Sequence, residues 1–205
     1  MEKEKELIQP PKGVGEEETL SPEKKLRRER TRQLHTGITS FELVSNKDVP
    51  IGNDLFRMSG LGNPFFKLPL HDVDSTLGPV LDPRISSNGS LVVFVCDKKL
   101  YTCTVMANDN TGETTSTMPK QLTHNARGLV CTNGLADFIV MEEMDRYQGF
   151  WISPDSENPN VAFEQSDKSH IDKFQILHSG QAIPLKQEYH HYLFSGDANP
   201  LVDWE

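Results

Sequence analysis

Apolar residues occur along this chain in short runs that are separated by clusters of Gly, Pro, Asn and Ser. Residues 38–44 alternate between apolar and polar side chains, and residues 91–95 form a continuous apolar run. Runs of this length, rich in β-branched and aromatic residues and bounded by turn formers, are typical of β-strands. Prolines flank and interrupt residues 65–70, so a strand and an irregular connection both stay open there. The pattern predicts a mostly β fold.

One combination of strand and turn occurs twice. Residues 85–95 and residues 152–164 each begin with a strand end and a polar turn, and then continue with apolar strand formers. The first copy extends into residues 100–105 and adds a fourth strand candidate at 120–123, and the second copy extends into 173–178. Two copies roughly 65 residues apart predict blades of a β-propeller, whereas a β-sandwich would give similar strands without the repeated turn.

Residues 1–36 differ in composition from the rest of the chain. Residues 1–20 are highly charged and carry two prolines and a run of three glutamates, so they cannot bury enough apolar surface to order themselves. Ser21-Pro22 then supplies an N-cap and a first-turn proline for a basic helix. Its basic residues could form a nuclear or nucleic-acid address, but the interspersed glutamates favour a solvated face. We expect an all-β fold: a disordered tail and solvated helix over residues 1–36, then a partial β-propeller of about two to three blades over residues 37–205, with a short inserted helix.

Composition and charge exclude several classes of function. The net charge of −9 argues against a nucleic-acid partner, because a phosphate backbone is bound by a basic surface. No apolar run approaches the roughly 18 residues that span a bilayer, and the charged first residues are unlike a signal peptide, so we expect a cytoplasmic protein without a membrane partner. Cys96, Cys103 and Cys131 form no Cys-x-x-Cys, which predicts free thiols rather than a disulfide framework or a zinc site. We expect neither a metal nor another cofactor.

The most informative stretch runs from Gly134 to Asp155. Its first half is a short apolar helix candidate that closes on Glu142 and Glu143, and its second half is an aromatic strand that ends in Ser-Pro-Asp. Adjacent helical residues point about 100° apart, so the two carboxylates converge on one target only near a helix end. Such a pair suits a cation, although an isolated Glu-Glu is usually no more than a solvated helix face.

The residues around this pair resemble a known family. They are, in chain order, Glu142, Glu143, Asp145, Arg146, Gly149, Phe150, Trp151, Ser153 and Pro154. They resemble the Glu-Glu, Asp-Arg and Gly-aromatic-Trp-Trp-Ser-Pro pattern in the propeller of the dipeptidyl peptidase IV group of prolyl oligopeptidase-like serine peptidases, with Ile152 in place of the second Trp. The resemblance implies that Glu142 and Glu143 are substrate-binding residues that hold the free amino terminus of a peptide.

The resemblance covers most of the chain. Residues 188–200 are similar to the family's His-x-Tyr-Pro-Phe-Ala-Gly-x-x-Asn segment, and residues 21–30 are similar to a stretch ahead of the first blade in plant members, which favours a plant-like source. The family's nucleophile motif, Gly-x-Ser-x-Gly, does not occur, so we identify no catalytic residue. Glu164, Asp167 and Asp172 are interpreted as scattered loop acids.

Two hypotheses of function follow. The first is the amino-terminal propeller portion of a dipeptidyl peptidase IV-like serine peptidase, truncated before the catalytic domain and inactive alone. In the complete family member, the resemblance implies proteolysis that releases N-terminal X-Pro dipeptides. The second is a stand-alone module without peptidase activity, which binds peptide amino termini or pairs with a full-length relative or a second copy of itself, because an open propeller exposes strand edges.

Overall fold

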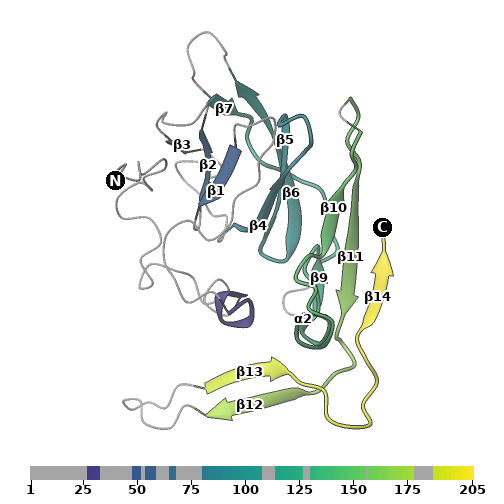
Figure 1. Cartoon of the computed structure of the whole chain (residues 1–205). Helices are drawn as coiled ribbons and strands as arrows, with labels where there is room; N and C mark the ends of the chain where they lie inside the picture. The colour runs from purple at the N-terminus through teal and green to yellow at the C-terminus, as the bar shows by residue number, and fades with distance from the viewer. Residues whose placement is uncertain are drawn as a thin grey trace, which may run out of the picture.

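The computed structural model describes residues 27–32, 48–51, 54–58, 65–67, 80–107, 114–126, 130–155, 157–177 and 187–205. Within these residues the chain is mostly β, with several antiparallel sheets and two short helical segments (Figure 1). The expectation of a mostly β fold is confirmed. The disordered tail predicted at residues 1–20 and the strand predicted at residues 38–44 lie outside the described residues.

The central sheet contains β4 (Leu81–Ile85), β5 (Leu91–Cys96), β6 (Lys99–Ala107), β7 (Thr114–Ser116) and β8 (Lys120–Gln121). All of its pairings are antiparallel, and β6 pairs with β8 near its start and with β7 near its end. The turn between β5 and β6 consists of Asp97 and Lys98, whose φ angles of 45° and 62° are those that a two-residue type I′ hairpin turn requires. The strands predicted at residues 91–95, 100–105 and 120–123 are therefore confirmed, the last in a shorter form.

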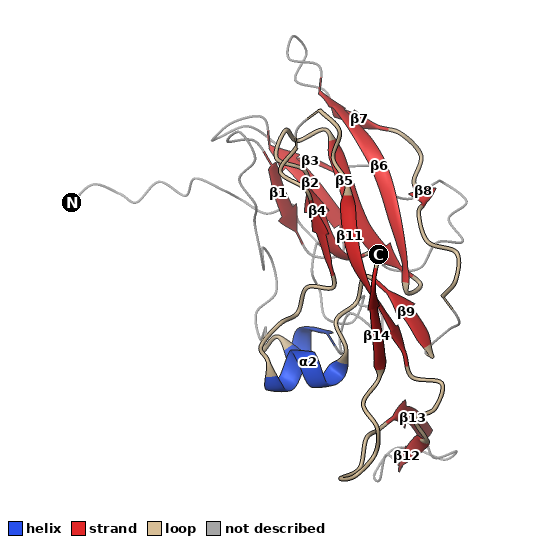
Figure 2. Cartoon of the chain, turned by 90° about the vertical axis from the view of Figure 1, so that its right-hand side faces the viewer, coloured by secondary structure: helices blue, strands red, loops and turns tan. Residues whose placement is uncertain are grey.

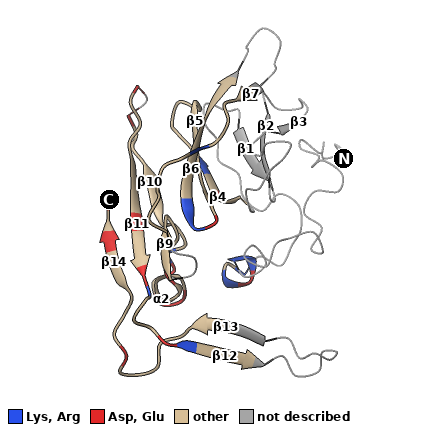
Figure 3. Ribbon diagram, turned by 180° about the vertical axis from the view of Figure 1, so that it is seen from behind, with Lys and Arg blue, Asp and Glu red and all other residues tan. Residues whose placement is uncertain are grey.

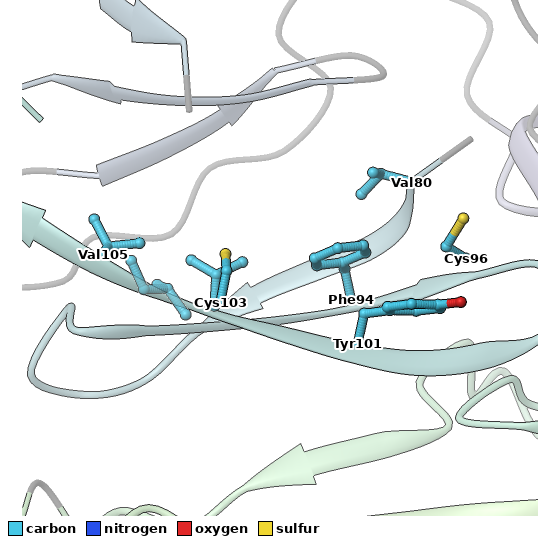
Figure 4. Close-up of a cluster of buried hydrophobic side chains, with 8 residues drawn as sticks. Val80, Phe94, Cys96, Tyr101, Cys103 and Val105 are labelled. Carbon is cyan, nitrogen blue, oxygen red and sulfur yellow. The ribbon is translucent and has the colours of Figure 1, made fainter. Parts of the chain in front are cut away.

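The central sheet is apolar on both faces. Side chains alternate along β5, so Phe94 points to one face and Val93 to the other. The first face carries cluster A, which consists of Val80, Ile85, Val92, Phe94, Cys96, Tyr101, Cys103 and Val105 (Figure 4). The opposite face carries cluster B, which consists of Leu81, Val93, Val95, Leu100 and Phe150. A sheet that is apolar on both faces must be covered on both, and Phe150 of the next sheet supplies part of that cover.

The second sheet contains β9 (Cys131–Asn133), β10 (Phe150–Ile152), β11 (Val161–Asp167) and β14 (Leu201–Trp204). β11 is its central strand. Its first three residues pair with β10 and its last three residues pair with β9, while β14 pairs with its opposite edge. The chain between β9 and β10 leaves the sheet edge, forms helix α2 (Phe138–Glu143) and returns. The helix-to-strand order predicted for Gly134 to Asp155 is therefore confirmed.

Two further sheets complete the described part. β1 (Asp48–Ile51), β2 (Asp54–Met58) and β3 (Phe65–Lys67) form an antiparallel sheet, and β12 (Lys173–Leu177) and β13 (Gln187–His191) form a hairpin that projects from the second sheet (Figures 1 and 2). The β1–β2 hairpin is absent from our sequence-based expectations, although Gly52-Asn53 between the two strands is a hairpin-turn signal. Figure 1 places the β1–β3 sheet on one side of the central sheet and the β9–β11–β14 sheet on the other, an arrangement compatible with propeller blades.

Candidate functional site

Helix α2 is short and is held at its start by a charged cap. The side chain of Asp137 accepts a hydrogen bond from the backbone N–H of Ile139 at 3.1 Å, which satisfies one of the free amides of the first turn. The second oxygen of the same carboxylate forms an ion pair with Nζ of Lys168 at 2.5 Å. Lys168 follows β11 directly, so this cap also ties the helix to the second sheet.

The insert that carries α2 is closed at its base by two glycines. The backbone N–H of Gly134 donates to the carbonyl of Glu164 at 2.8 Å, and the N–H of Glu164 donates to the carbonyl of Gly149 at 2.8 Å. An isolated bridge between Leu135 and Gln148 lies next to this base. A Cβ atom on Gly149 would lie 2.5 Å from the carbonyl carbon of Gly134, closer than real contacts allow. The base therefore requires glycine at position 149.

An ion pair between the buried Glu164 and the partly exposed Arg146 lies close to the end of α2. Oε2 of Glu164 accepts a hydrogen bond from Nη2 of Arg146 at 2.6 Å, and the Glu164 side chain is fully buried. The other arm of the guanidinium donates to the carbonyl of Gln148 at 2.6 Å, and the group lies 5.6 Å from the ring centroids of Trp151 and Trp204. The interpretation of Glu164 and Asp167 as loop acids is wrong, because both lie within β11, whereas Asp172 lies between β11 and β12 as expected. Side chains alternate along β11, so Glu164 points to the sheet face opposite to that of Val161 and Phe163. The insert with Arg146 covers Glu164 on that face.

The basic segment 27–32 contacts α2 through Arg30, and residues 27–30 form a helical turn, most of which Figure 3 shows in blue. Arg27 forms an ion pair with Asp82 at 3.1 Å and donates to the carbonyl of Tyr147 at 3.4 Å. The guanidinium of Arg30 lies 4.9 Å from the ring centroid of Phe138 on α2. The expectation that this helix presents a plain solvated face is therefore wrong for Arg27 and Arg30, because apolar and acidic groups 50 or more residues away contact them.

Glu142 and Glu143 both lie on the last turn of α2 and both are exposed. Glu142 lines an open hollow of about 230 Å³ together with Glu29, Arg30, Arg32 and Phe138. Its Oε2 lies 4.0 Å from the guanidinium of Arg32. Among the described residues no hydrogen bond or ion pair engages the Glu143 side chain. The arginines of this hollow are not among the predicted site residues, and only their basic sequence pattern signals them.

Electrostatic coupling extends across the hollow. Burial lowers the pKa of Arg30, and the nearby carboxylates of Glu142 and Asp137 oppose this shift. Interaction with the Asp145 side chain is the main cause that raises the pKa of Tyr147 above its ordinary value. The hydroxyl of Tyr147 donates to the carbonyl of Arg30 at 3.4 Å, which is a further link between segment 27–32 and the insert.

The end of α2 combines two sources of negative potential. The C-terminal carbonyls of a helix carry partial negative charge, and the two exposed carboxylates add full charges at the same end. This arrangement can bind a small cation such as an ammonium group. Within the described residues, no group of three or more His, Cys, Asp or Glu side chains could hold a metal ion, and no helix is long and apolar enough to cross a bilayer.

A protein family and two curated proteins are similar to parts of this chain. Residues 64–205 match the family described as "Dipeptidyl peptidase IV (DPP IV) N-terminal region". Human dipeptidyl peptidase 8 is 22% identical over 201 residues, which cover 90% of this chain and 22% of the human protein. Mouse dipeptidyl peptidase 8 is 28% identical over 79 residues, which cover 35% of this chain and 9% of the mouse protein. The family match includes α2 and every strand from β3 onward, and this chain therefore belongs to the dipeptidyl peptidase IV N-terminal region family.

Proposed function

We propose that this chain binds the free amino terminus of a peptide through Glu142 and Glu143, as the propeller portion of a dipeptidyl peptidase IV-like serine peptidase. The observation that carries the proposal is the position of both carboxylates at the exposed end of an inserted helix, inside the stretch that matches the family. The side-by-side antiparallel sheets support a partial propeller as the scaffold.

The chemistry of the hollow suits a peptide amino terminus. An ammonium group donates up to three hydrogen bonds, and charge-assisted bonds of this kind are worth roughly 1.5 to 3 kcal/mol each. Glu142 lies 4.0 Å from Arg32, so an incoming ammonium group shares this carboxylate with a guanidinium, whereas the Glu143 carboxylate has no such competitor among the described residues. The guanidinium groups of Arg30 and Arg32 supply donors for the carbonyl oxygen of the first peptide residue.

Within a complete peptidase, this anchor fixes the distance between the amino terminus of the peptide and the bond that is cleaved. A peptide held by its amino terminus presents a fixed bond to a nucleophile, which restricts cleavage to the release of dipeptides. The 205 residues carry no Gly-x-Ser-x-Gly, so we assign them binding and not hydrolysis. The matched span covers less than a quarter of each curated relative. We propose that the peptidase chemistry belongs to the part of those relatives that lies outside the matched span.

Peptide binding tests this function directly. The purified chain is titrated with a fluorescent Gly-Pro peptide that has either a free or an acetylated amino terminus, and Glu142→Gln, Glu143→Gln and the exposed control Glu157→Gln are compared. We expect the free peptide to bind, the acetylated peptide to bind at least about tenfold more weakly, and each site variant to lose about tenfold in affinity for the free peptide. Equal binding of the two peptides, or an equal loss in Glu157→Gln, would contradict the proposal.

A hydrolysis assay separates binding from catalysis. We expect no turnover of a Gly-Pro amide reporter and no labelling by an active-site serine reagent. Turnover that Glu142→Gln abolishes would reveal a nucleophile within these residues and would overturn the assignment of binding alone.

A second candidate function, pairing with a longer relative or with another copy of the chain, is supported by an exposed aromatic surface. Phe174, Tyr192 and Phe194 pack against one another with ring centroids 5.2–6.0 Å apart, yet each is 44–53% exposed. All four residues of β14 are also exposed, and among the described residues β14 pairs only with β11. An exposed apolar surface and an open strand edge each favour association.

A further inference from the structure

Among the described residues, Arg146 joins the end of α2 to the second sheet by side-chain contacts. Its backbone N–H donates to the carbonyl of Val140 at 3.2 Å, which ties it to the helix. Its guanidinium pairs with Glu164 in β11 and also bonds the carbonyl of Gln148. The same side chain lies close to Trp151 of β10. Arg146 is therefore held from several directions and links the last helical turn to two strands.

Helix α2 depends on such external links for its direction. It has six residues, and a helix of this length is not stable in isolation. The ion pair between Asp137 and Lys168 holds its start, but the carboxylates lie at the opposite end. There the chain reverses through Asp145, whose φ of 53° is left-handed. The pairing of Arg146 is the side-chain contact that fixes this reversal to the sheet.

Glu164 makes three connections at the base of the insert. Its backbone bonds both Gly134 and Gly149, and its side chain bonds Arg146. It is fully buried, so it cannot contact a peptide. Its Oε1 accepts no hydrogen bond among the described residues, so the pair is not fully satisfied. Replacing an imperfect buried ion pair by apolar residues is often neutral or stabilising, which means that stability and positioning can be separated by experiment.

We propose that Arg146 and Glu164 are positioning residues, which fix the direction of Glu142 and Glu143 at the end of α2 without touching the bound peptide. This inference rests on the proposed function of the carboxylate pair. It deepens that function by assigning the geometry of the site to an ion pair between the insert and a buried carboxylate of the neighbouring sheet.

The double variant Arg146→Met/Glu164→Leu removes the ion pair and keeps the buried volume. We expect it to unfold at about the same denaturant concentration as the wild type, and to bind the free-amino Gly-Pro peptide about tenfold more weakly. Arg146→Lys keeps the charge but not the two-armed contact, so we expect a folded protein with a smaller loss of affinity. A folded double variant that binds the free peptide as well as the wild type overturns the inference.

A mutant cycle distinguishes positioning from a general structural role. Glu143→Gln should cost about tenfold in affinity in the wild type and less than about threefold in the double variant, because a misdirected carboxylate has less binding to lose. Equal losses in both backgrounds show that the ion pair and the carboxylate act independently, and they overturn the inference. Should the double variant fail to fold, the same cycle in the Arg146→Lys background decides the question.

A measurement without peptide separates this inference from the proposed function. Hydrogen exchange at the amides of Met144 and Arg146, which both bond Val140, should become faster in the double variant, while the amides of β5 stay protected. If the wild type binds the free and the acetylated peptide equally well, the proposed function is wrong. Unchanged exchange at these two amides in the double variant overturns the positioning role, whatever the peptide result. Faster exchange there supports the role of the ion pair in holding the helix end.

Discussion

Gly149→Ala should destabilise this protein more than any ordinary surface substitution. The new Cβ would lie 2.5–2.6 Å from three backbone atoms of Gly134 and Leu135, about 1 Å inside normal contact distance. Backbone atoms cannot rotate away as a side chain can, so the base of the insert must open. Overpacking of this kind costs about 1–3 kcal/mol, and weakening the two hydrogen bonds of Glu164 adds about 0.5–1.5 kcal/mol each. We expect the free energy of unfolding to fall by about 2–6 kcal/mol.

Urea denaturation combined with hydrogen exchange measures this effect. In Gly149→Ala, the amides of Gly134 and Glu164 should lose protection because their bonds close the base of the insert. The matched control is Gly196→Ala: Gly196 has a φ of 101° but no neighbouring atom within 4 Å, so alanine there reports backbone strain alone, about 1–2 kcal/mol. A change below about 0.5 kcal/mol in Gly149→Ala, with both amides still protected, would refute the reasoning.

Two further predictions concern cluster A and the exposed aromatic surface. Burial raises the pKa of Cys103 to about 11, so the neutral thiol contributes stability that is complete below about pH 9 and is lost as the pH rises towards 11, up to about 3 kcal/mol. Denaturation of the wild type and of Cys103→Ala below pH 9 and near pH 11 should show a steeper alkaline loss of stability in the wild type. Parallel stability profiles of the two proteins would contradict this prediction. If the surface of Phe174, Tyr192 and Phe194 pairs two copies of the chain, sedimentation should show a mass that rises with protein concentration. Phe174→Ser should reduce this rise, and the exposed control Met118→Ser should leave it unchanged. A wild type that stays monomeric at every concentration would exclude self-pairing.

The local elements follow from local patterns. The apolar run of residues 91–95 forms β5, and the helix-to-strand order around Glu142 and Glu143 is present as expected. These features depend on periodicity and on turn residues close in sequence, which is the information that a single sequence carries. The β1–β2 hairpin shows that even a local signal such as Gly52-Asn53 is missed when the flanking strands are short.

Local sequence patterns predict only part of the candidate site. The carboxylate pair stands out because of the residues around it, whereas Arg30 and Arg32 belong to a segment whose composition alone indicates a solvated helix. The bond from Arg27 to Tyr147 joins residues 120 positions apart. No periodic pattern encodes a contact between segments so distant, because it depends on how the sheets bring the two segments together.

The sequence by itself determined strands β5, β6 and β8 of the central sheet, the inserted helix, the Glu142–Glu143 pair and a resemblance to the family that residues 64–205 match. Only the tertiary structure decided that Glu164 is buried, that Gly149 must lack a side chain and that the basic turn lies against α2. The physical reason is that alternation assigns a residue to one face of a strand, but whether that face meets water or protein depends on what packs over it. Here the insert itself covers Glu164, and that cover exists only in the folded chain.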